Sequence, residues 1–318
     1  MPPAEKKPAN PTFMEAAEDP GQISHFPALT TGLNGEPLLS ACSAQDFEYG
    51  FPLLESRNPA MRTLMHTALR VAPSQAPILL CGETGTGKEI LARFIHGHSL
   101  RAEHPFVVIN CAAIPDNLLE SELFGYRRGA FTEARRDKKG QLVLANHGTI
   151  LLDEIAEMSP GVQGKLLRFV QERTILPLGA TTPIHLDVRI LAATNYDQEE
   201  AIVNGAFRRD LYYRLNVFQL ELLPLRQRTE DISRLVSFFI ERFNRENKTA
   251  VQAMADRVLE TLVNHSWPGN IRELENVIHH AVILAGEGVI NLNHLPPDIF
   301  GNRSGDIFLE PKPGKHAH

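Results

Sequence analysis

The sequence has few cysteines and no long apolar run, and both shortages limit the classes of protein that it can encode. Its three cysteines, Cys42, Cys81 and Cys111, are widely spaced among 318 residues. Three such thiols predict neither a disulfide framework nor a zinc site, and they fit a reducing cytoplasm. The N-terminus lacks the apolar core of a signal peptide, and no apolar run reaches the roughly 18 residues that span a bilayer. We therefore expect a soluble, cytoplasmic protein with no membrane partner.

An excess of basic residues is also missing. The formal net charge is −6 at pH 7, and 22% of the residues are charged. This balance argues against a protein coated in nucleic-acid-binding surface, although it does not exclude a local basic patch. The hydrophobic content of 43% is ordinary for a globular protein, and the length allows one large domain or two modest ones.

Composition and periodicity divide the chain into four parts. Residues 1–50 are rich in proline, glycine, alanine and serine, so we expect a mostly disordered leader. Residues 51–228 alternate short apolar runs with helical segments, which predicts an α/β domain with a parallel sheet between layers of helices. Residues 229–300 carry three amphipathic stripes and no strand signal, which predicts a small all-α domain, and residues 301–318 predict a flexible tail. The strand candidates are residues 77–81, 106–109, 149–152, 188–193 and 217–222.

The most informative motif is a glycine-rich segment between an apolar run and a helical stripe. It comprises Gly82, Glu83, Thr84, Gly85, Thr86, Gly87, Lys88 and Glu89. In this context the glycines let backbone N–H groups surround phosphate oxygens, Lys88 reaches the outer phosphates, and the helix N-terminus adds a favourable dipole. The segment predicts a Walker A phosphate loop. Glu89 stands where the commonest form of that loop has a magnesium-holding hydroxyl.

Two adjacent acids end the apolar run at residues 149–152. An apolar strand that delivers carboxylates at its carboxyl end places them beside the phosphates in sheets of this class. Asp153 is suited to orient a hydrated magnesium ion, and Glu154 to polarise an attacking water. The competing interpretation is that Asp153 and Glu154 only cap the following helix, where acids are common.

Together with five further segments, these motifs resemble the central ATPase domain of the bacterial enhancer-binding proteins, the AAA+ activators of sigma-54 RNA polymerase. The resemblance covers about residues 51–300. It implies an AAA+ P-loop fold with a helical lid, ATP and Mg²⁺ as cofactors, and the sigma-54 RNA polymerase holoenzyme as partner. The further segments are residues 106–113, 122–134, 192–195, 207–216 and 267–274, in this order.

The resemblance implies roles for three polar residues near strand ends. Asn110 matches an asparagine that holds the catalytic glutamate in an inactive pose until the nucleotide state releases it. Its simpler interpretation is an amide that completes its own hydrogen bonds at a strand end. Thr194 and Asn195 match the first sensor, which responds to the outermost phosphate.

The resemblance also implies roles for three arginines. Arg208 and Arg214 match two arginine fingers, which enter the neighbouring subunit's site and neutralise charge on the transferred phosphoryl group. Arg209 beside them is expected to be a solvated side chain. Arg272 matches the second sensor, which joins the helical domain to the nucleotide. Fingers supplied by a neighbour require a ring, so we expect a homo-oligomer, usually a hexamer in the family, or a hetero-oligomer with a related activator.

One loop departs from the family pattern. In the family, a mobile loop contacts sigma-54 and transmits to it the movement driven by ATP hydrolysis. The tip of this loop has the sequence Gly-Ala-Phe-Thr-Gly-Ala. Phe131 and Thr132, the pair expected to touch sigma-54, are kept, whereas Glu133 replaces the second glycine. Because glycine permits backbone angles that a side chain makes costly, we expect Glu133 to stiffen or reshape the tip. The corresponding residues are Gly129, Ala130, Phe131, Thr132, Glu133 and Ala134.

Basic residues surround this tip, and three interpretations of them stay open. They form a solvated charged face, they pair with Glu133, or they contact promoter DNA. The flanking residues are Arg127, Arg128, Arg135, Arg136, Lys138 and Lys139.

Two functions compete at this point. The first is an ATPase that forms a ring and remodels sigma-54 polymerase so that a promoter can open. The second is an ATP-binding partner or regulatory subunit whose altered tip cannot remodel sigma-54 unaided. A generic P-loop kinase or GTPase would not explain the sensor and finger residues together. No helix-turn-helix is recognisable, so we expect DNA contact to be indirect or through a domain outside this sequence, and whether the sequence is a full-length protein stays open.

Overall fold

The computed structural model describes residues 56–300. The predicted leader at residues 1–50 and tail at residues 301–318 lie outside the described residues, as does Cys42. Within the described range, none of the helices is both long and apolar enough to cross a membrane.

A sheet of five parallel strands forms the centre of the α/β part, in the order β2-β5-β8-β1-β9. In the register of the central strands, Leu80 pairs with Ala193 on one side and with Leu220 on the other. Because all five strands run the same way, their carboxyl ends meet at one edge of the sheet. The strands are β1 (Ile78–Cys81), β2 (Phe106–Asn110), β5 (Thr149–Asp153), β8 (Arg189–Thr194) and β9 (Phe218–Glu221), which confirms the five predicted runs.

Burial explains why these runs are so apolar in the sequence. Every residue of β1 and of β8 is buried, whereas the edge strands β2 and β9 are partly exposed. Strands covered on both faces read as continuous apolar runs instead of alternating ones. The polar residues that end them, such as Asp153 and Thr194, therefore stand out at the carboxyl edge.

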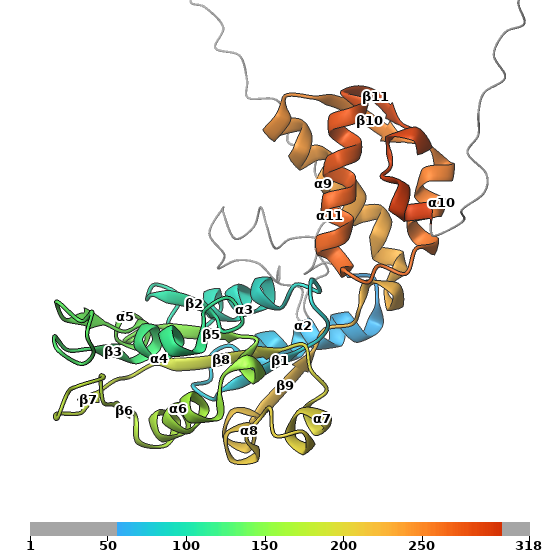
Figure 1. Ribbon diagram of the computed structural model, residues 1–318. Coiled ribbons are helices and arrows are strands. Elements are labelled where there is room, and N and C mark those ends of the chain that lie inside the picture. The colour runs from blue at the N-terminus through green and yellow to red at the C-terminus, as the bar shows by residue number, and fades with distance from the viewer. Residues whose placement is uncertain (1–55, 301–318) are drawn as a thin grey trace, which may run out of the picture. The chain divides into compact units, whose positions relative to one another are not determined.

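Helices cover both faces of this sheet, as predicted. Helices α6 and α8 lie on one face and α3 on the other (Figure 1). Leu79 and Ile150 pack in one apolar cluster with Leu166 of α6 and Leu211 of α8. The helices of this part are α2 (Pro59–Val71), α3 (Lys88–Gly97), α4 (Asp116–Phe124), α5 (Gln141–Leu144), α6 (Pro160–Glu172), α7 (Gln198–Val203) and α8 (Arg209–Leu215).

Short elements complete the α/β part. Two antiparallel hairpins pair β3 (Gly125–Tyr126) with β4 (Lys138–Lys139) and β6 (Thr174–Ile175) with β7 (Ile184–His185). The predicted sigma-54 loop joins β3 to β4. The single-turn 3₁₀ helices of this part are η1 (Ile155–Glu157) and η2 (Leu225–Gln227), whereas η3 (Thr229–Asp231), η4 (Leu292–His294) and η5 (Pro297–Phe300) belong to the helical part.

Three amphipathic helices follow the sheet, in agreement with the predicted stripes. They are α9 (Ile232–Asn247), α10 (Asp256–Asn264) and α11 (Asn270–Ala285). Their buried residues recur at helical spacing, for example Leu235, Phe239 and Phe243 in α9. The indole of Trp267, the chain's single tryptophan, is fully buried and donates to the Leu262 carbonyl at 2.7 Å.

The helical part also contains two strands, and the expectation of helices alone was wrong in this detail. Strand β10 (Ala250–Met254) pairs in parallel with β11 (Glu287–Ile290), with a register shift between Val251 and Ala253. Both strands are short, β10 holds a single β-branched residue, and Gly288 sits inside β11. Such segments have weak strand propensity of their own. Their pairing depends on a partner far away in the sequence, which local patterns do not reveal.

Candidate functional site

The glycine-rich segment forms a tight loop between β1 and α3. Gly85 (φ +80°) and Gly87 (φ +105°) adopt left-handed backbone conformations that a side chain would strain. Thr86 is fully buried, and its hydroxyl donates to the Glu83 carbonyl at 2.7 Å. The loop thus closes on itself and leads directly into the first turn of α3, where free backbone N–H groups favour phosphate.

Lys88 is the first residue of α3, and its ammonium group lies across this loop. Its Nζ donates to the Gly82 carbonyl at 2.8 Å and to the Glu83 carbonyl at 3.4 Å. Nζ also lies 3.7 Å from Oε1 of Glu154, and both side chains are largely buried. A cation held between the loop and an acid in this way is placed to meet phosphate oxygens.

Glu154 follows the carboxyl end of β5 in a left-handed conformation (φ +52°), which is uncommon for a residue other than glycine. Strained backbone of this kind concentrates at functional sites. Burial raises the pKa of Glu154, while the nearby Lys88 ammonium opposes that rise. Asp153 precedes it, and Oδ1 of Asp153 accepts from the Glu154 backbone N–H at 3.1 Å.

Asn195 connects Glu154 to the phosphate loop. Its backbone N–H donates to Oε2 of Glu154 at 3.2 Å, and its Nδ2 donates to the Thr84 hydroxyl at 3.2 Å. Thr194 is buried at the end of β8, where its hydroxyl accepts from the Tyr196 N–H at 3.2 Å. The predicted loop, acid and first sensor therefore converge at one edge of the sheet.

Asn110 does not make the contact that the resemblance implied. Its Oδ1 accepts from the backbone N–H groups of Ala112 and Ala113, at 3.0 and 3.1 Å. An asparagine that folds back on its own loop is a common turn, and this satisfies the side chain without Glu154. Within residues 56–300, Glu154 instead contacts Asn195 and Lys88. A switch role for Asn110 stays a prediction.

Of the two predicted arginine fingers, Arg208 is the N-terminal cap of α8 and Arg214 lies in its last turn. The Arg208 guanidinium is exposed and donates to both carboxylate oxygens of Asp210, at 3.0 and 2.7 Å. This contact lowers the pKa of Asp210. Arg214 and Arg209 are exposed as well. All three guanidinium groups are therefore accessible at the surface of this chain, and that of Arg208 is held by Asp210.

Arg272, the predicted second sensor, stands beside the phosphate loop. A Cβ built on Gly85 would lie 2.3 Å from the Gly269 carbonyl oxygen and 3.2 Å from the Arg272 Cβ. The Ile271 N–H donates to the Gly85 carbonyl at 3.0 Å. The start of α11 and the loop thus approach so closely that only glycine fits between them.

Three residues that the sequence did not indicate as functional form hydrogen bonds with the phosphate loop. Asn270, fully buried in a left-handed conformation (φ +54°), donates to Oε2 of Glu83 at 3.1 Å and to the Thr84 carbonyl at 3.0 Å. Arg226 forms a two-bond ion pair with the Glu83 carboxylate, which lowers the pKa of Glu83. The buried Arg228 donates to the Thr86 carbonyl at 3.0 Å. Asn270 lies in the segment 267–274 that carries the family resemblance, but the contacts themselves arise only when distant segments meet.

The acids at this edge suit a magnesium ion that keeps most of its water. Within the described residues, no group of three or more His, Cys, Asp or Glu is arranged to hold a metal. Mg²⁺ bound with a nucleotide usually takes one or two carboxylates, phosphate oxygens and water, so a single acid such as Asp153 is enough. Glu89 does not supply a ligand in this conformation, because its carboxylate pairs with Arg93 at 2.7 Å on the exposed face of α3.

The two cysteines of the described range flank this site as inert, buried thiols. Cys81 ends β1 directly before the phosphate loop, and Gln198 Nε2 donates to its Sγ at 2.8 Å. Burial raises the pKa of Cys81 and of Cys111 to about 12.

The predicted sigma-54 loop carries its unusual glutamate without backbone strain. Its positive φ within the described residues occurs at Gly129 (φ +83°) and not at Glu133, so this conformation does not require glycine at position 133. The Glu133 side chain is exposed and pairs with none of the described cations, so the interpretation in which its basic neighbours pair with it is not supported within residues 56–300. Phe131 is 42% exposed and its ring packs edge-on against Tyr126 at 4.9 Å.

At the base of this loop, some of the basic side chains form ion pairs. Arg127 pairs with Asp137, and Lys138 pairs with Glu122. The Arg128 N–H also donates to Asp137 at 2.8 Å. The remaining basic side chains are exposed to solvent. They are those of Arg128, Arg135, Arg136 and Lys139.

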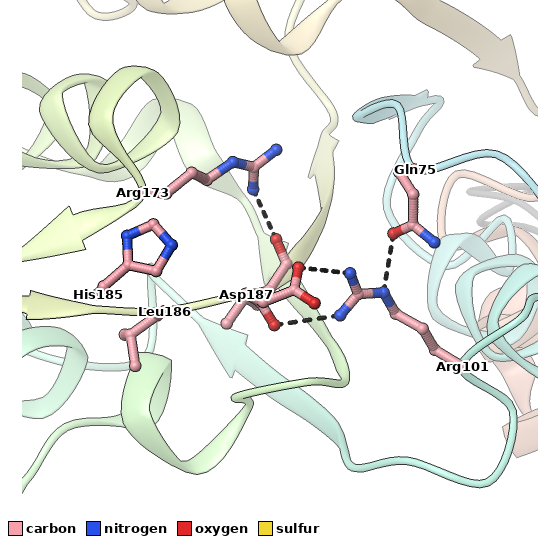
Figure 2. Close-up of a pocket in the computed structure, with 7 residues that line it drawn as sticks. Gln75, Arg101, Arg173, His185, Leu186 and Asp187 are labelled. Carbon is pink, nitrogen blue, oxygen red and sulfur yellow. Dashed lines mark hydrogen bonds and ion pairs between the residues drawn. The ribbon is translucent and has the colours of Figure 1, made fainter.

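A pocket of about 200 Å³ lies at the opposite, amino edge of the sheet (Figure 2). Arg101 crosses it, with Nε bonded to Gln75 (2.8 Å), Nη1 to the carbonyls of Gly148 and Asp187 (3.2 and 3.1 Å), and Nη2 to Oδ1 of Asp187 (2.6 Å). Each guanidinium nitrogen therefore has a partner. The lining comes from four stretches of the chain, and none of the phosphate-loop residues takes part in it. Its lining residues are Gln75, Arg101, Arg173, His185, Leu186, Asp187 and Val188.

The β2-β5-β8-β1-β9 sheet, the phosphate loop and the acids at its carboxyl edge define an AAA+ P-loop protein. The family model described as "Sigma-54 interaction domain" matches residues 54–221, and the one described as "AAA+ ATPase lid domain" matches residues 226–307. The chain belongs to the family of sigma-54-dependent AAA+ transcription activators.

Individual relatives agree with this assignment. The chain is 46% identical over 249 residues to the transcriptional regulatory protein ZraR of Klebsiella oxytoca, covering 78% of this chain and 56% of ZraR. It is 48% identical over 244 residues to the regulatory protein AtoC of Escherichia coli K12, covering 77% and 53%. A crystal structure of NtrX from Brucella abortus in complex with ADP superimposes with a TM-score of 0.72 at 35% identity, covering 77% of this chain and 54% of NtrX. The chain spans about half the length of these relatives.

Proposed function

We propose that this chain hydrolyses ATP within a ring and uses the energy to remodel the sigma-54 RNA polymerase holoenzyme, so that promoter DNA opens. The observation that carries the proposal is the convergence of Lys88, Glu154 and Asn195 on the phosphate loop. Family membership and the nucleotide in the NtrX crystal structure support it. Such a protein would act in the cytoplasm, where the polymerase works.

The chemistry would be hydrolysis of the bond between the β- and γ-phosphates. Lys88 would neutralise charge on the outer phosphates, and Asp153 would orient a hydrated Mg²⁺, which when bound supplies positive charge to the same oxygens. Glu154 would accept a hydrogen bond from the attacking water and orient it. Asn195, which already joins Glu154 to the loop, would report whether the γ-phosphate is present.

A ring would complete each site. Arg208 and Arg214 are exposed on α8, so we propose that they enter the site of the next subunit and stabilise charge in the transition state. A hexamer is the expected assembly. A single subunit lacks this charge at its own phosphate loop and would hydrolyse ATP slowly.

Phe131 and Thr132 at the loop tip would contact sigma-54, and contact with DNA would be indirect or through a domain outside this sequence. The alternative, a partner subunit that cannot remodel sigma-54, depends on Glu133. The relaxed backbone at that position supports a tip that keeps its shape. The exposed negative charge of Glu133 at the loop tip is the observation that favours the partner-subunit function.

The test measures ATP turnover and open-complex formation at a sigma-54 promoter with the purified chain. Glu154→Gln should retain ATP but lose turnover by a factor of about 10² to 10⁴, because the water loses its base. Glu103→Gln, which changes an exposed acid outside this site, is the control. Undiminished turnover in Glu154→Gln would remove this residue from the mechanism.

The same assay separates the two functions. If the wild-type chain opens the promoter, the partner-subunit function is excluded. If it hydrolyses ATP without opening the promoter, and Glu133→Gly restores opening, the partner-subunit function is correct for this chain.

A further inference from the structure

Gln163 of α6 is a fully buried polar residue for which the functions above give no role. Its Nε2 donates to the carbonyl oxygens of Met158 at 2.8 Å and Ala206 at 2.7 Å. Its Oε1 accepts from the backbone N–H of Arg208 at 2.8 Å. Both amide hydrogens and the amide oxygen are therefore used, and only this orientation of the amide satisfies all three partners.

These partners belong to two functional segments that are far apart in the sequence. Met158 closes the 3₁₀ helix η1, which begins directly after Glu154, and the Glu157 N–H donates to the Glu154 carbonyl at 3.0 Å. Arg208 is the N-terminal cap of α8, the helix that carries both predicted fingers. One side chain thus joins the segment that follows the catalytic acid to the start of the finger helix.

The surroundings of Arg208 show that its backbone is fixed while its side chain faces outward. Phe207, the preceding residue, is buried, and its N–H donates to the Ala201 carbonyl at 3.0 Å. The Arg208 guanidinium is exposed on Asp210, and a Cβ built on Gly164 would lie 3.9 Å from its Nη1. The Arg208 guanidinium therefore lies near Gly164 of α6. The neighbouring residue of the same turn, Gln163, bonds the Arg208 backbone.

We propose that Gln163 is a positioning residue that couples the Glu154 segment of one subunit to the arginine that this subunit presents to its neighbour. A shift of η1 would move Met158, and the shared amide would carry that shift to the Arg208 backbone. Displacements of about 1 Å at a catalytic group can change rates about 100-fold. The inference rests on the proposed function, because it requires Arg208 to act in a neighbouring site.

The competing explanation is that Gln163 only stabilises the fold, as buried and satisfied amides commonly do. The two explanations differ in which site suffers when Gln163 is changed. A structural role damages the subunit's own site or its stability. A positioning role damages the next subunit's site and leaves the variant's own site intact.

The first experiment compares Gln163→Met with Gln171→Met in the full chain. Methionine has a similar volume to glutamine but cannot form the three hydrogen bonds, and Gln171 is an exposed glutamine on the same helix. ATP turnover by Gln163→Met should fall about tenfold or more, with KM within about twofold, because fingers act on the transition state. Gln171→Met should match the wild type. If Gln163→Met instead kept the wild-type kcat and lowered kcat/KM only through a higher KM, the proposal would be overturned.

The decisive experiment mixes subunits. Glu154→Gln subunits keep an intact finger but lack the base, whereas Gln163→Met subunits keep the base but misplace the finger. Glu154→Gln alone should be nearly inactive, and Gln163→Met alone should keep about a tenth of wild-type turnover or less. Co-assembled mixtures should recover turnover at Gln163→Met sites that lie beside a Glu154→Gln subunit. A mixture that recovers nothing would show that Gln163→Met has damaged its own site.

A second mixture separates this inference from the proposed function. Arg208→Ala subunits mixed with Glu154→Gln subunits should recover turnover if fingers act between subunits. If neither mixture recovers, the ring arrangement itself is wrong; if only the Arg208→Ala mixture recovers, the role of Gln163 alone is wrong. Thermal melting and binding of a fluorescent ATP analogue verify folding, and Gln163→Leu, which also removes all three hydrogen bonds without burying a charge, replaces the methionine variant should that variant not fold.

Discussion

The two edges of the central sheet each hold a basic side chain next to an acid, and the two pairs differ in geometry. At the amino edge, Arg101 meets Asp187 at 2.6 Å. At the carboxyl edge, Lys88 meets Glu154 at 3.7 Å. The pKa of Asp187 is lowered by its hydrogen bond to Arg101, whereas the pKa of Glu154 is raised by burial.

This difference separates a cluster that stabilises the fold from one prepared for chemistry. The Arg101 guanidinium has a partner on each nitrogen, so little is gained by adding a ligand. The Lys88–Glu154 contact is longer, lies beside a strained backbone at Glu154, and leaves the carboxylate partly unstabilised. Perturbed acids of this kind are common at active sites, because a base must be able to exchange partners.

The largest expected effect that follows from this comparison is at Lys88. We expect Lys88→Ala to weaken ATP binding about 100-fold, because charge-assisted contacts with phosphates contribute about 3 kcal/mol. Titration with a fluorescent ATP analogue measures the affinity, and Lys165→Ala, a partly exposed lysine that pairs with Glu120, is the control. Equal affinities for Lys88→Ala and the wild type would mean that the carboxyl edge is not the phosphate site.

The next effect concerns the amino edge and should appear in stability. Arg101→Met should lower the free energy of unfolding by about 2 kcal/mol, because the Gly148 and Asp187 carbonyls lose their donor. Urea unfolding measures this change. Arg168→Met, which removes an exposed pair with Glu172, should cost no more than about 0.5 kcal/mol. ATP affinity should stay unchanged in both variants, and a parallel loss in Arg101→Met would contradict the division between the two edges.

The smallest effects are in the pH dependence, and their signs differ. Because the pKa of Glu154 is raised, its ionised fraction falls at higher pH than for a free glutamate, so turnover should be lost first on acidification. Because the pKa of Asp187 is lowered, its stabilisation is complete above the ordinary aspartate value of about 4 and is lost as pH falls through the lower folded value. Turnover and circular dichroism over one pH series check this order, and a coincident loss of both would contradict it.

Much of the fold followed from local patterns. The apolar runs at residues 78–81 and 189–194 are buried on both faces, so burial left a direct signature in the sequence. The strands β10 and β11 left no such signature in the sequence. They contain small residues and a glycine, and each pairs with a partner that is distant in the sequence. Local propensity is informative where the structure is locally determined, and weak where pairing comes from tertiary contacts.

The site divides in the same way. Lys88, Asp153 and Glu154 were predictable because their chemistry depends on a fixed distance in the sequence from a strand or a helix. Asn110 makes local turn contacts instead of the predicted contact with Glu154. Arg226 and Asn270 bond Glu83, which is more than 140 residues away, and Gln163 bonds the Arg208 backbone 45 residues away. No spacing rule identifies such contacts.

The buried thiol of Cys81 has a practical consequence for spectroscopy. Burial raises the pKa of Cys81 and of Cys111 to about 12, so both thiols are essentially un-ionised at pH 8. Maleimide dyes react with exposed thiolates, so these two positions would remain unlabelled in the folded protein. Once Cys42 is replaced by serine, a cysteine placed at Thr132 would be the single reactive site, and its fluorescence would report movement of the loop tip during nucleotide turnover.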